Sequence, residues 1–107
     1  MTRITLFWGK DGLVGLESQG HSGGGVKGED VVCAAVSSLV QALLVGLRVA
    51  KVSANCEIDS SAPLIRARWA ESEALGLNLL TQTIVLSLRE IASGRAGHVS
   101  ISEVYLS

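Results

Sequence analysis

Apolar and polar residues alternate near the N-terminus of the chain with the two-residue period of a β-strand. Residues 3–8 (RITLFW) are rich in β-forming types, and residues 9–12 (GKDG) contain the Asp-Gly pair typical of hairpin turns. Residues 13–19 (LVGLESQ) follow as the returning strand. Alternation recurs over 64–69 (LIRARW), where Ile65, Ala67 and Trp69 share one face and Arg66 and Arg68 share the other, which we expect to be solvated.

Two longer segments place apolar residues at helical spacing. The first helix is expected over about residues 31–52, with Asp30 as its N-cap. The second is expected over about residues 73–93 and ends before Gly94; its apolar stripe consists of Leu77, Leu80, Ile84, Leu88 and Ile91. With short strands at 55–59 and 98–105, the order is ββαββαβ. This order predicts an α/β (α+β) fold of two layers, in which a mostly antiparallel or mixed sheet carries two helices on one face.

Length and composition favour one domain, residues 1–107, that associates with a second copy of itself. Hydrophobic residues make up 48% of the chain and aromatic residues only 4%, so we expect part of the aliphatic surface to be buried in a homodimer. The net charge of -1 and the lack of a basic patch argue against direct nucleic-acid binding. Two cysteines form no disulfide framework, and we expect a cytoplasmic protein.

The uncharged segment 31–47 is at the lower length limit for crossing a bilayer. Ser38, Gln41, Val45 and Arg48 fall along one side of this segment when it is helical. A buried helix with a narrow solvated edge therefore explains the segment better than a membrane span, and no membrane partner is expected.

The glycine-rich stretch GHSGGGVKGEDVVCAA, residues 20–35, is the main candidate for chemistry, and three interpretations compete for it. Gly23, Gly25 and Gly28 fit the G-x-G-x-x-G pattern of dinucleotide sites, but Glu29 and Asp30 would place negative charge beside a pyrophosphate. The strong nitrogen and sulfur ligands for a metal are scattered without zinc-site spacing; they are His21, Cys33, Cys56 and His98.

Nucleophilic catalysis is the third interpretation. If Asp30 caps the helix, Cys33 lies in its first turn, where the helix dipole and free amides stabilise a thiolate. His21 ends the preceding strand and could return to Cys33 as its acid–base partner. A cysteine and a histidine alone are not specific, because a cysteine in a first turn is more often inert.

The segment GHSGGGVKGEDVVCAAVSSL, residues 20–39, resembles the signature of Prp, the bacterial family of ribosomal-processing cysteine proteases. The matching residues keep the spacing of that signature; they are Gly20-His21, Gly28, Asp30, Val32-Cys33-Ala34 and Ser37. The resemblance implies a cytoplasmic, homodimeric endopeptidase without a cofactor. Its substrate would be a large-subunit ribosomal protein precursor, from which it removes a short N-terminal extension after an apolar or aromatic residue.

The resemblance also implies the roles of two residues, and the positions of their neighbours suggest further roles. His21 and Cys33 would form the catalytic dyad, with Gly20 serving the backbone geometry beside His21. Asp30 would orient His21 or only cap the helix, and Ser37 would contact the dyad or only allow close packing. Apart from the resemblance, we hypothesise that the glycine-rich loop closes on the substrate, the alternative being a simple connector; its candidate substrate-contacting residues are Ser22, Gly23, Gly24, Gly25 and Gly28.

Outside this segment, Cys56 is expected in the core and His98 at the surface. Two other functions compete with the protease. One is a non-catalytic ribosome-assembly factor that binds the same peptide, and the other is a nucleotide-binding domain.

Overall fold

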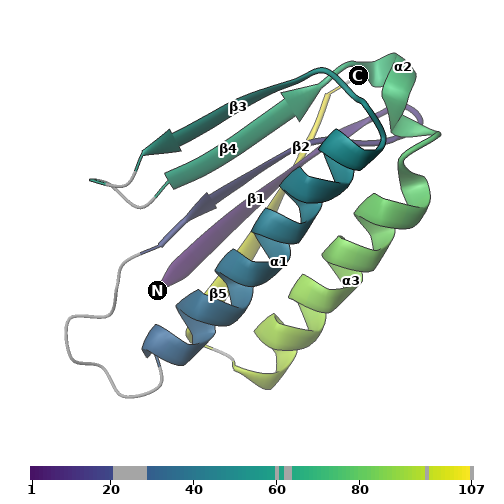
Figure 1. Cartoon of the computed structure of the whole chain (residues 1–107). Coiled ribbons are helices and arrows are strands. Elements are labelled where there is room, and N and C mark those ends of the chain that lie inside the picture. Colours follow the sequence, from purple (N-terminus) through teal and green to yellow (C-terminus); the bar gives the residue numbers. More distant parts are fainter. Residues whose placement is uncertain (21–28, 60, 62–63, 96, 107) are drawn as a thin grey trace.

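A computed structural model of the chain describes residues 1–20, 29–59, 61, 64–95 and 97–106. Strands and helices alternate in this part of the chain in the predicted order, with one short helix added (Figure 1). The elements are β1 (Thr2–Gly9), β2 (Gly12–Gln19), α1 (Glu29–Val49), β3 (Ala54–Asp59), β4 (Leu64–Trp69), α2 (Glu71–Ala74), α3 (Asn78–Gly94) and β5 (Val99–Tyr105). The predicted two-layer α+β fold is therefore confirmed.

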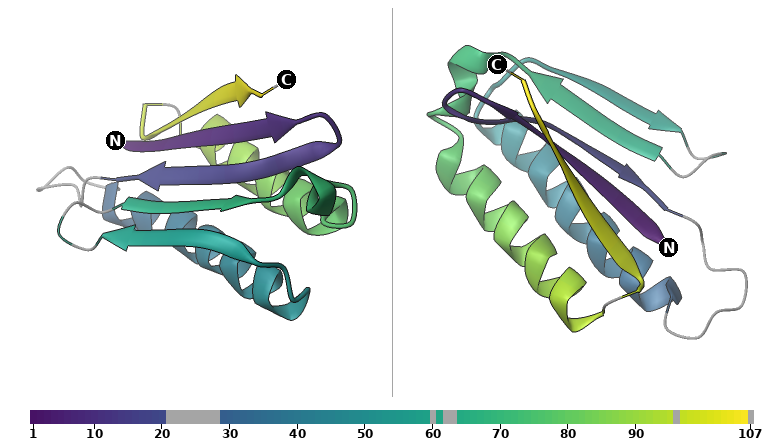
Figure 2. Two further views of the ribbon diagram at one scale, coloured as in Figure 1. Left: turned by 90° about the horizontal axis from the view of Figure 1, so that it is seen from above. Right: turned by 180° about the vertical axis from the view of Figure 1, so that it is seen from behind.

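The five strands form one mixed sheet in the order β3-β4-β2-β1-β5. Strand β1 pairs antiparallel with β2 and parallel with β5, while β4 pairs antiparallel with both β2 and β3. Helices α1 and α3 lie side by side on one face of the sheet, and the other face is open (Figures 1 and 2). Because Arg3 pairs with Gln19, the start of β1 and the end of β2 lie at the same end of the sheet.

The predicted N-terminal hairpin is present, and its turn is fixed by contacts with the helical layer. Gly12 has a φ of +143°, and a Cβ on it would lie 2.5 Å from Asn78 Oδ1, so a side chain does not fit there. The backbone N–H of Asp11 donates a hydrogen bond to Glu71 Oε1 at 2.9 Å. The hairpin turn is therefore joined to the segment that contains α2 and the start of α3.

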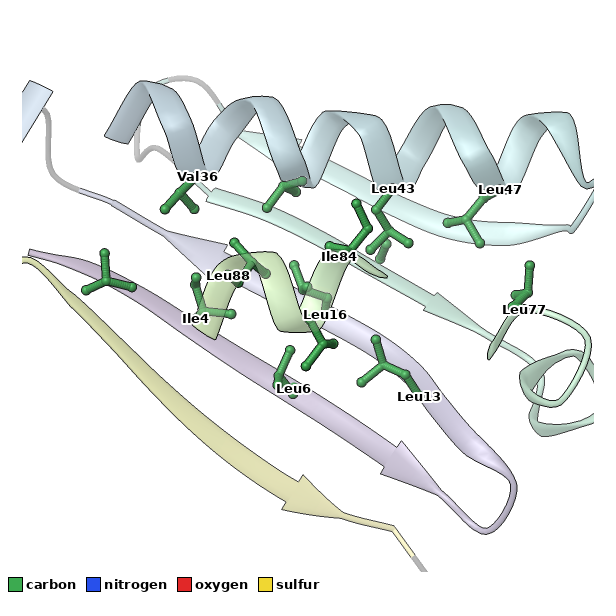
Figure 3. Close-up of a cluster of buried hydrophobic side chains, with 14 of the residues drawn as sticks. Ile4, Leu6, Leu13, Leu16, Val36, Leu43, Leu47, Leu77, Ile84 and Leu88 are labelled. Carbon is green, nitrogen blue, oxygen red and sulfur yellow. The ribbon is translucent and has the colours of Figure 1, made fainter. Parts of the chain in front are cut away.

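The core lies between the sheet and the two long helices (Figure 3). Leucine and isoleucine side chains of β1 and β2 meet the inward faces of α1 and α3 there, and the buried set includes Ile4, Leu6, Leu13, Leu16, Val36, Leu43, Leu47, Ile84 and Leu88. Trp69 is buried among them, and its indole Nε1 donates a hydrogen bond to the Leu13 carbonyl at 2.9 Å. The predicted inward face of β4 and the predicted apolar stripe of the second helix are thus confirmed.

The arginines of β4 lie on the open face of the sheet, as predicted, but both make close contacts there. Arg66 donates hydrogen bonds to Glu17 at 3.1 Å and to Glu57 at 2.9 Å, and the bond to Glu17 is the main cause of its raised pKa. Arg68 stacks over the ring of Phe7 at 4.8 Å from the ring centroid.

Both helices differ from their predicted bounds for local reasons. α1 ends at Val49 rather than near residue 52, because Lys51 takes a left-handed conformation with φ 58°. The N–H of Lys51 then bonds the Arg48 carbonyl, and the N–H of Val52 bonds the Leu47 carbonyl, which is a Schellman termination. The predicted continuous helix over 73–93 was wrong at its start, since residues 75–77 form a turn around Gly76 between α2 and α3.

Among the described residues, the segment Val31–Val49 of α1 has the length and apolar composition of a membrane-crossing helix, with a mean hydropathy of 1.9. In this fold the same helix packs on the sheet and on α3, and its predicted solvated edge is exposed; that edge comprises Ser38, Gln41, Val45 and Arg48.

Candidate active site

Cys33 lies near the N-terminal end of α1, directly above the end of the sheet where β1 begins. It is the fifth residue of the helix, so it belongs to the second turn rather than to the predicted first turn. Side chains of an α-helix lean toward its N-terminus, which directs the sulfur back over the first turn. The sulfur is half-buried and lies 3.1 Å from Thr2 Oγ1, a distance at which the two groups form a hydrogen bond.

Thr2 is the first residue of β1 and is held firmly in place. Its side chain faces the helices, in the same alternation as Ile4 and Leu6, and Thr2 is only 2% exposed. Its backbone N–H donates a hydrogen bond to the His98 carbonyl at 2.9 Å, at the point where β1 begins to pair with β5. This hydrogen-bond partner of the Cys33 sulfur is therefore held where β1 meets β5.

Gly20 completes the described part of the site. It follows the last residue of β2, and a Cβ placed on it would lie 3.7 Å from the Cys33 sulfur and 3.5 Å from Thr2 Oγ1. Glycine thus leaves the space beside the sulfur open. The structure brings together two residues that are far apart in the sequence, Gly20 and Cys33, and the next residue along the chain after Gly20 is His21.

Several predicted site residues lie outside the described residues, namely His21, Ser22, Gly23, Gly24, Gly25 and Gly28. Asp30 was predicted as the N-cap, and this was wrong, because the helix begins at Glu29 and Asp30 is its second residue. Ser37 is exposed, one helical turn after Cys33.

The prediction that Cys56 belongs to the core was wrong. Cys56 is exposed, although its pairing with the buried Ala67 shows that it faces the helical side of the sheet. Its strand β3 is an edge strand that the helices leave uncovered, so alternation alone does not bury it. His98 is half-buried rather than exposed, since it immediately precedes β5 and its carbonyl is bonded to Thr2.

Thr2 is the site residue that sequence reasoning missed. The signal was present, because Thr2 shares its face of the strand with Ile4 and Leu6 and is therefore a polar residue that points into the core. Within the described ranges, no three of the histidine, cysteine, aspartate and glutamate side chains come together in a way that could hold a metal ion.

A family model described as cysteine protease Prp matches residues 1–100 of this chain. Among solved structures, SMU.848 from Streptococcus mutans is similar with a TM-score of 0.87 at 25% sequence identity, covering 99% of this chain and 96% of that chain. The essential ribosomal processing protease Prp from S. aureus in complex with a substrate peptide is similar with a TM-score of 0.87 at 16% identity, covering 97% and 100%. The same protease in complex with a covalently linked product peptide has a TM-score of 0.83 at 17% identity, again covering 97% and 100%. None of the curated proteins searched matches this sequence.

Proposed function

This chain belongs to the cysteine protease Prp family and is thus a peptide hydrolase, and we propose that it removes a short N-terminal extension from a large-subunit ribosomal protein precursor. The observation that carries the proposal is the position of the Cys33 sulfur beside Gly20, the residue that precedes His21. The S. aureus structures support the choice of substrate, since that ribosomal processing protease is seen with a substrate peptide and with a covalently linked product peptide. The proposed site of action is the cytoplasm.

In the proposed reaction, Cys33 is the nucleophile and His21 is the base and acid. His21 accepts the thiol proton, and the Cys33 sulfur forms a bond to the scissile carbonyl carbon. The tetrahedral intermediate breaks its C–N bond, and the leaving amine takes the proton from the His21 imidazolium. Water then attacks the thioester with His21 again accepting a proton, which releases the carboxylic acid and restores the Cys33 thiol.

The position of Cys33 suits the first step. Its sulfur lies near the N-terminal end of α1, where the helix dipole favours a negative charge. The open space at Gly20 gives a carbonyl carbon room to approach the sulfur to the 3–3.5 Å that a near-attack geometry requires. Asp30 and Ser37, one turn before and one turn after Cys33 on the same helix, are proposed as supporting residues.

The experiment that tests the function uses the ribosomal protein precursor from the same genome and follows its intact mass with time. We expect wild type to release one defined N-terminal peptide and Cys33→Ala to release none, while His21→Ala should be slowed by at least about 100-fold, the lower range for general acid–base catalysis. Cys56→Ala is the matched control, because it removes the exposed cysteine and should retain wild-type activity. Cleavage by Cys33→Ala at the wild-type rate would contradict the proposal.

We also propose that the protein acts as a homodimer through the outer face of its helical layer. Exposed apolar side chains lie there on both helices; they are Val31, Val45 and Val49 on α1 and Leu79 and Leu86 on α3. Leu79 is 85% and Leu86 58% exposed, and a group of exposed aliphatic side chains on one face is typical of an interaction site. Sedimentation equilibrium should give twice the mass of one chain for wild type. For the double variant Leu79→Glu, Leu86→Glu it should give the mass of one chain. A wild-type protein that is still monomeric at about 100 μM would refute the dimer, because stable dimers form well below that concentration.

A further inference from the structure

The hydroxyl group of Thr2 contacts the sulfur of the proposed nucleophile, and the proposed reaction gives it no role. Thr2 Oγ1 lies 3.1 Å from the Cys33 sulfur, and the threonine is 2% exposed. We propose that Thr2 is a positioning residue that fixes the Cys33 sulfur and stabilises its thiolate by donating a hydrogen bond. This inference rests on the proposed function, because it assigns a partner to the same nucleophile.

The chemistry of the two groups defines the direction of this hydrogen bond. In the neutral state, either the thiol or the hydroxyl can be the donor. Once Cys33 has lost its proton, the sulfur can only accept, so the Thr2 hydroxyl must be the donor. The thiol proton passes to His21 in the proposed reaction, while Thr2 keeps its own proton and only reorients it. Because hydrogen bonds to charged groups are stronger than those between neutral groups, the contact favours the thiolate over the thiol.

The surroundings of Thr2 make this contact selective for one sulfur position. The backbone of Thr2 is bonded to the His98 carbonyl, and its side chain lies among buried residues of the sheet. A sulfur held against this hydroxyl remains beside the open space at Gly20, where a substrate carbonyl can approach. Since Thr2 is covered from solvent, it has no surface with which to bind the peptide itself. Its removal should therefore reduce kcat and leave KM nearly unchanged.

The test compares variants at position 2 that keep the side-chain hydroxyl with variants that lack it. Thr2→Val keeps the shape and removes the hydroxyl, whereas Thr2→Ser keeps the hydroxyl and removes the methyl group. Thr2→Ala and Thr2→Ser form a second pair that differs by the hydroxyl. This pair is used if a urea unfolding curve shows that valine at position 2 disturbs folding. The matched control is Thr5→Val on the same strand, because Thr5 faces the open side of the sheet.

The primary measurement is the rate of Cys33 alkylation by iodoacetamide from pH 5 to pH 10, read by peptide mass spectrometry so that Cys56 serves as an internal reference. We expect Thr2→Val and Thr2→Ala to move the midpoint of the Cys33 profile up by about 0.5 to 1 pH unit and to slow alkylation at pH 7 by about 3- to 10-fold. Thr2→Ser and Thr5→Val should stay within about twofold of wild type, and the Cys56 profile should not change.

The ionisable groups on the elements around Cys33 are the same in all these variants. Among the described residues they are the Met1 amino group and Arg3 at the start of β1, His98 before β5, Glu29 and Asp30 at the start of α1, and Glu90 and Arg95 at the end of α3. His21, the proposed acid–base partner of Cys33, is also unchanged. A shift that is present in Thr2→Val and restored in Thr2→Ser is therefore caused by the hydroxyl. A Thr2→Val profile that superposes on wild type, or an equal shift in Thr2→Ser, would overturn the proposal.

The alkylation arm does not depend on peptidase activity, so the two proposals can fail separately. If wild type cleaves no precursor, the proposed function fails, and the alkylation profiles still decide the role of Thr2. If wild type cleaves the precursor and Thr2→Val retains its kcat and its alkylation profile, the proposed function stands and the role of Thr2 is refuted.

Discussion

Gly46 of α1 lies against Leu80 of α3, and adding a methyl group at Gly46 tests how the two helices are packed. A Cβ on Gly46 would lie 2.5 Å from Leu80 Cδ2, 2.6 Å from Cδ1 and 3.1 Å from Cγ. All three atoms belong to one side chain, which is partly buried against the core and can move only in part. The substitution Gly46→Ala therefore forces Leu80 to shift or the helices to separate.

Two opposing effects determine the size of the change in the free energy of unfolding. Alanine is better than glycine inside a helix by about 1 kcal/mol, which favours the variant. Overpacking a filled interface costs about 1–3 kcal/mol, and a Cβ at 2.5 and 2.6 Å from the two methyl carbons of Leu80 belongs in the middle of that range. The net expectation is a loss of about 1 kcal/mol, which lowers the Tm by about 4–8 °C for a domain of this size.

The assay is urea unfolding of Gly46→Ala, Leu80→Ala and the double variant. With Leu80 shortened, the new methyl group has room, so we expect Gly46→Ala to be stabilising by about 1 kcal/mol in that background, which gives a coupling energy of about 2 kcal/mol. Gly94→Ala in α3 is the control, since a Cβ there has no atom within 4 Å. Cys33 lies thirteen residues away along α1, and its alkylation rate should be unchanged. Equal effects of Gly46→Ala in both backgrounds would show that Leu80 does not limit the space at Gly46.

Three further substitutions test the site, the surface and the core. Gly20→Ala should fold with nearly wild-type stability, because its Cβ meets nothing closer than 3.5 Å. It should lower kcat/KM for peptide cleavage, because the new methyl group fills the space beside the Cys33 sulfur. Glu103→Gln should lower stability at pH 7 by about 0.2–1 kcal/mol, since it replaces the carboxylate that Arg89 binds at 2.6 Å. Leu88→Ala, at a fully buried position, should lose about 3–4 kcal/mol in urea unfolding.

The pH dependence of the Glu103 effect has a defined sign. The hydrogen bond from Arg89 lowers the pKa of Glu103, so the folded state holds the carboxylate more strongly than the unfolded state does. The stabilisation is complete above the ordinary pKa of 4.5 and is lost as the pH falls through the lowered value. The stability difference between wild type and Glu103→Gln should therefore be constant near neutral pH and shrink below pH 4.5. A stability difference that grows on acidification would contradict this sign. Wild-type kcat/KM in Gly20→Ala would contradict the expected effect at the site, and unchanged stability of Leu88→Ala would contradict the expected effect in the core.

The strands and the family could be predicted from the sequence because their signals are local. Alternation over 3–8 and 13–19, with the Asp-Gly turn between them, defines the hairpin, and the spacing from Gly20 to Ser37 carries the family resemblance that the family model confirms. These features depend on neighbouring residues along the chain, so one sequence is enough to recognise them.

The features that sequence reasoning missed depend on contacts between distant segments. Cys56 alternates like a core residue, but its strand is placed at the edge of the sheet, where the helices do not cover it. Thr2 and Cys33 are 31 residues apart, and only the meeting of β1 with the start of α1 brings their side chains together. The break between α2 and α3 depends on Gly76 and on the bond from the hairpin turn to Glu71, which ties α2 to the sheet.

Capture of the covalent intermediate on Cys33 would show directly that this residue is the nucleophile. Wild type is mixed with the ribosomal protein precursor, quenched in acid within the first turnover, and analysed by intact mass and peptide mapping. We expect a mass increase equal to that of the released N-terminal peptide less one water, located on Cys33 as a thioester and absent from Cys33→Ala. Cleavage of the precursor without any acyl group on Cys33, and with equal speed in Cys33→Ala, would contradict it.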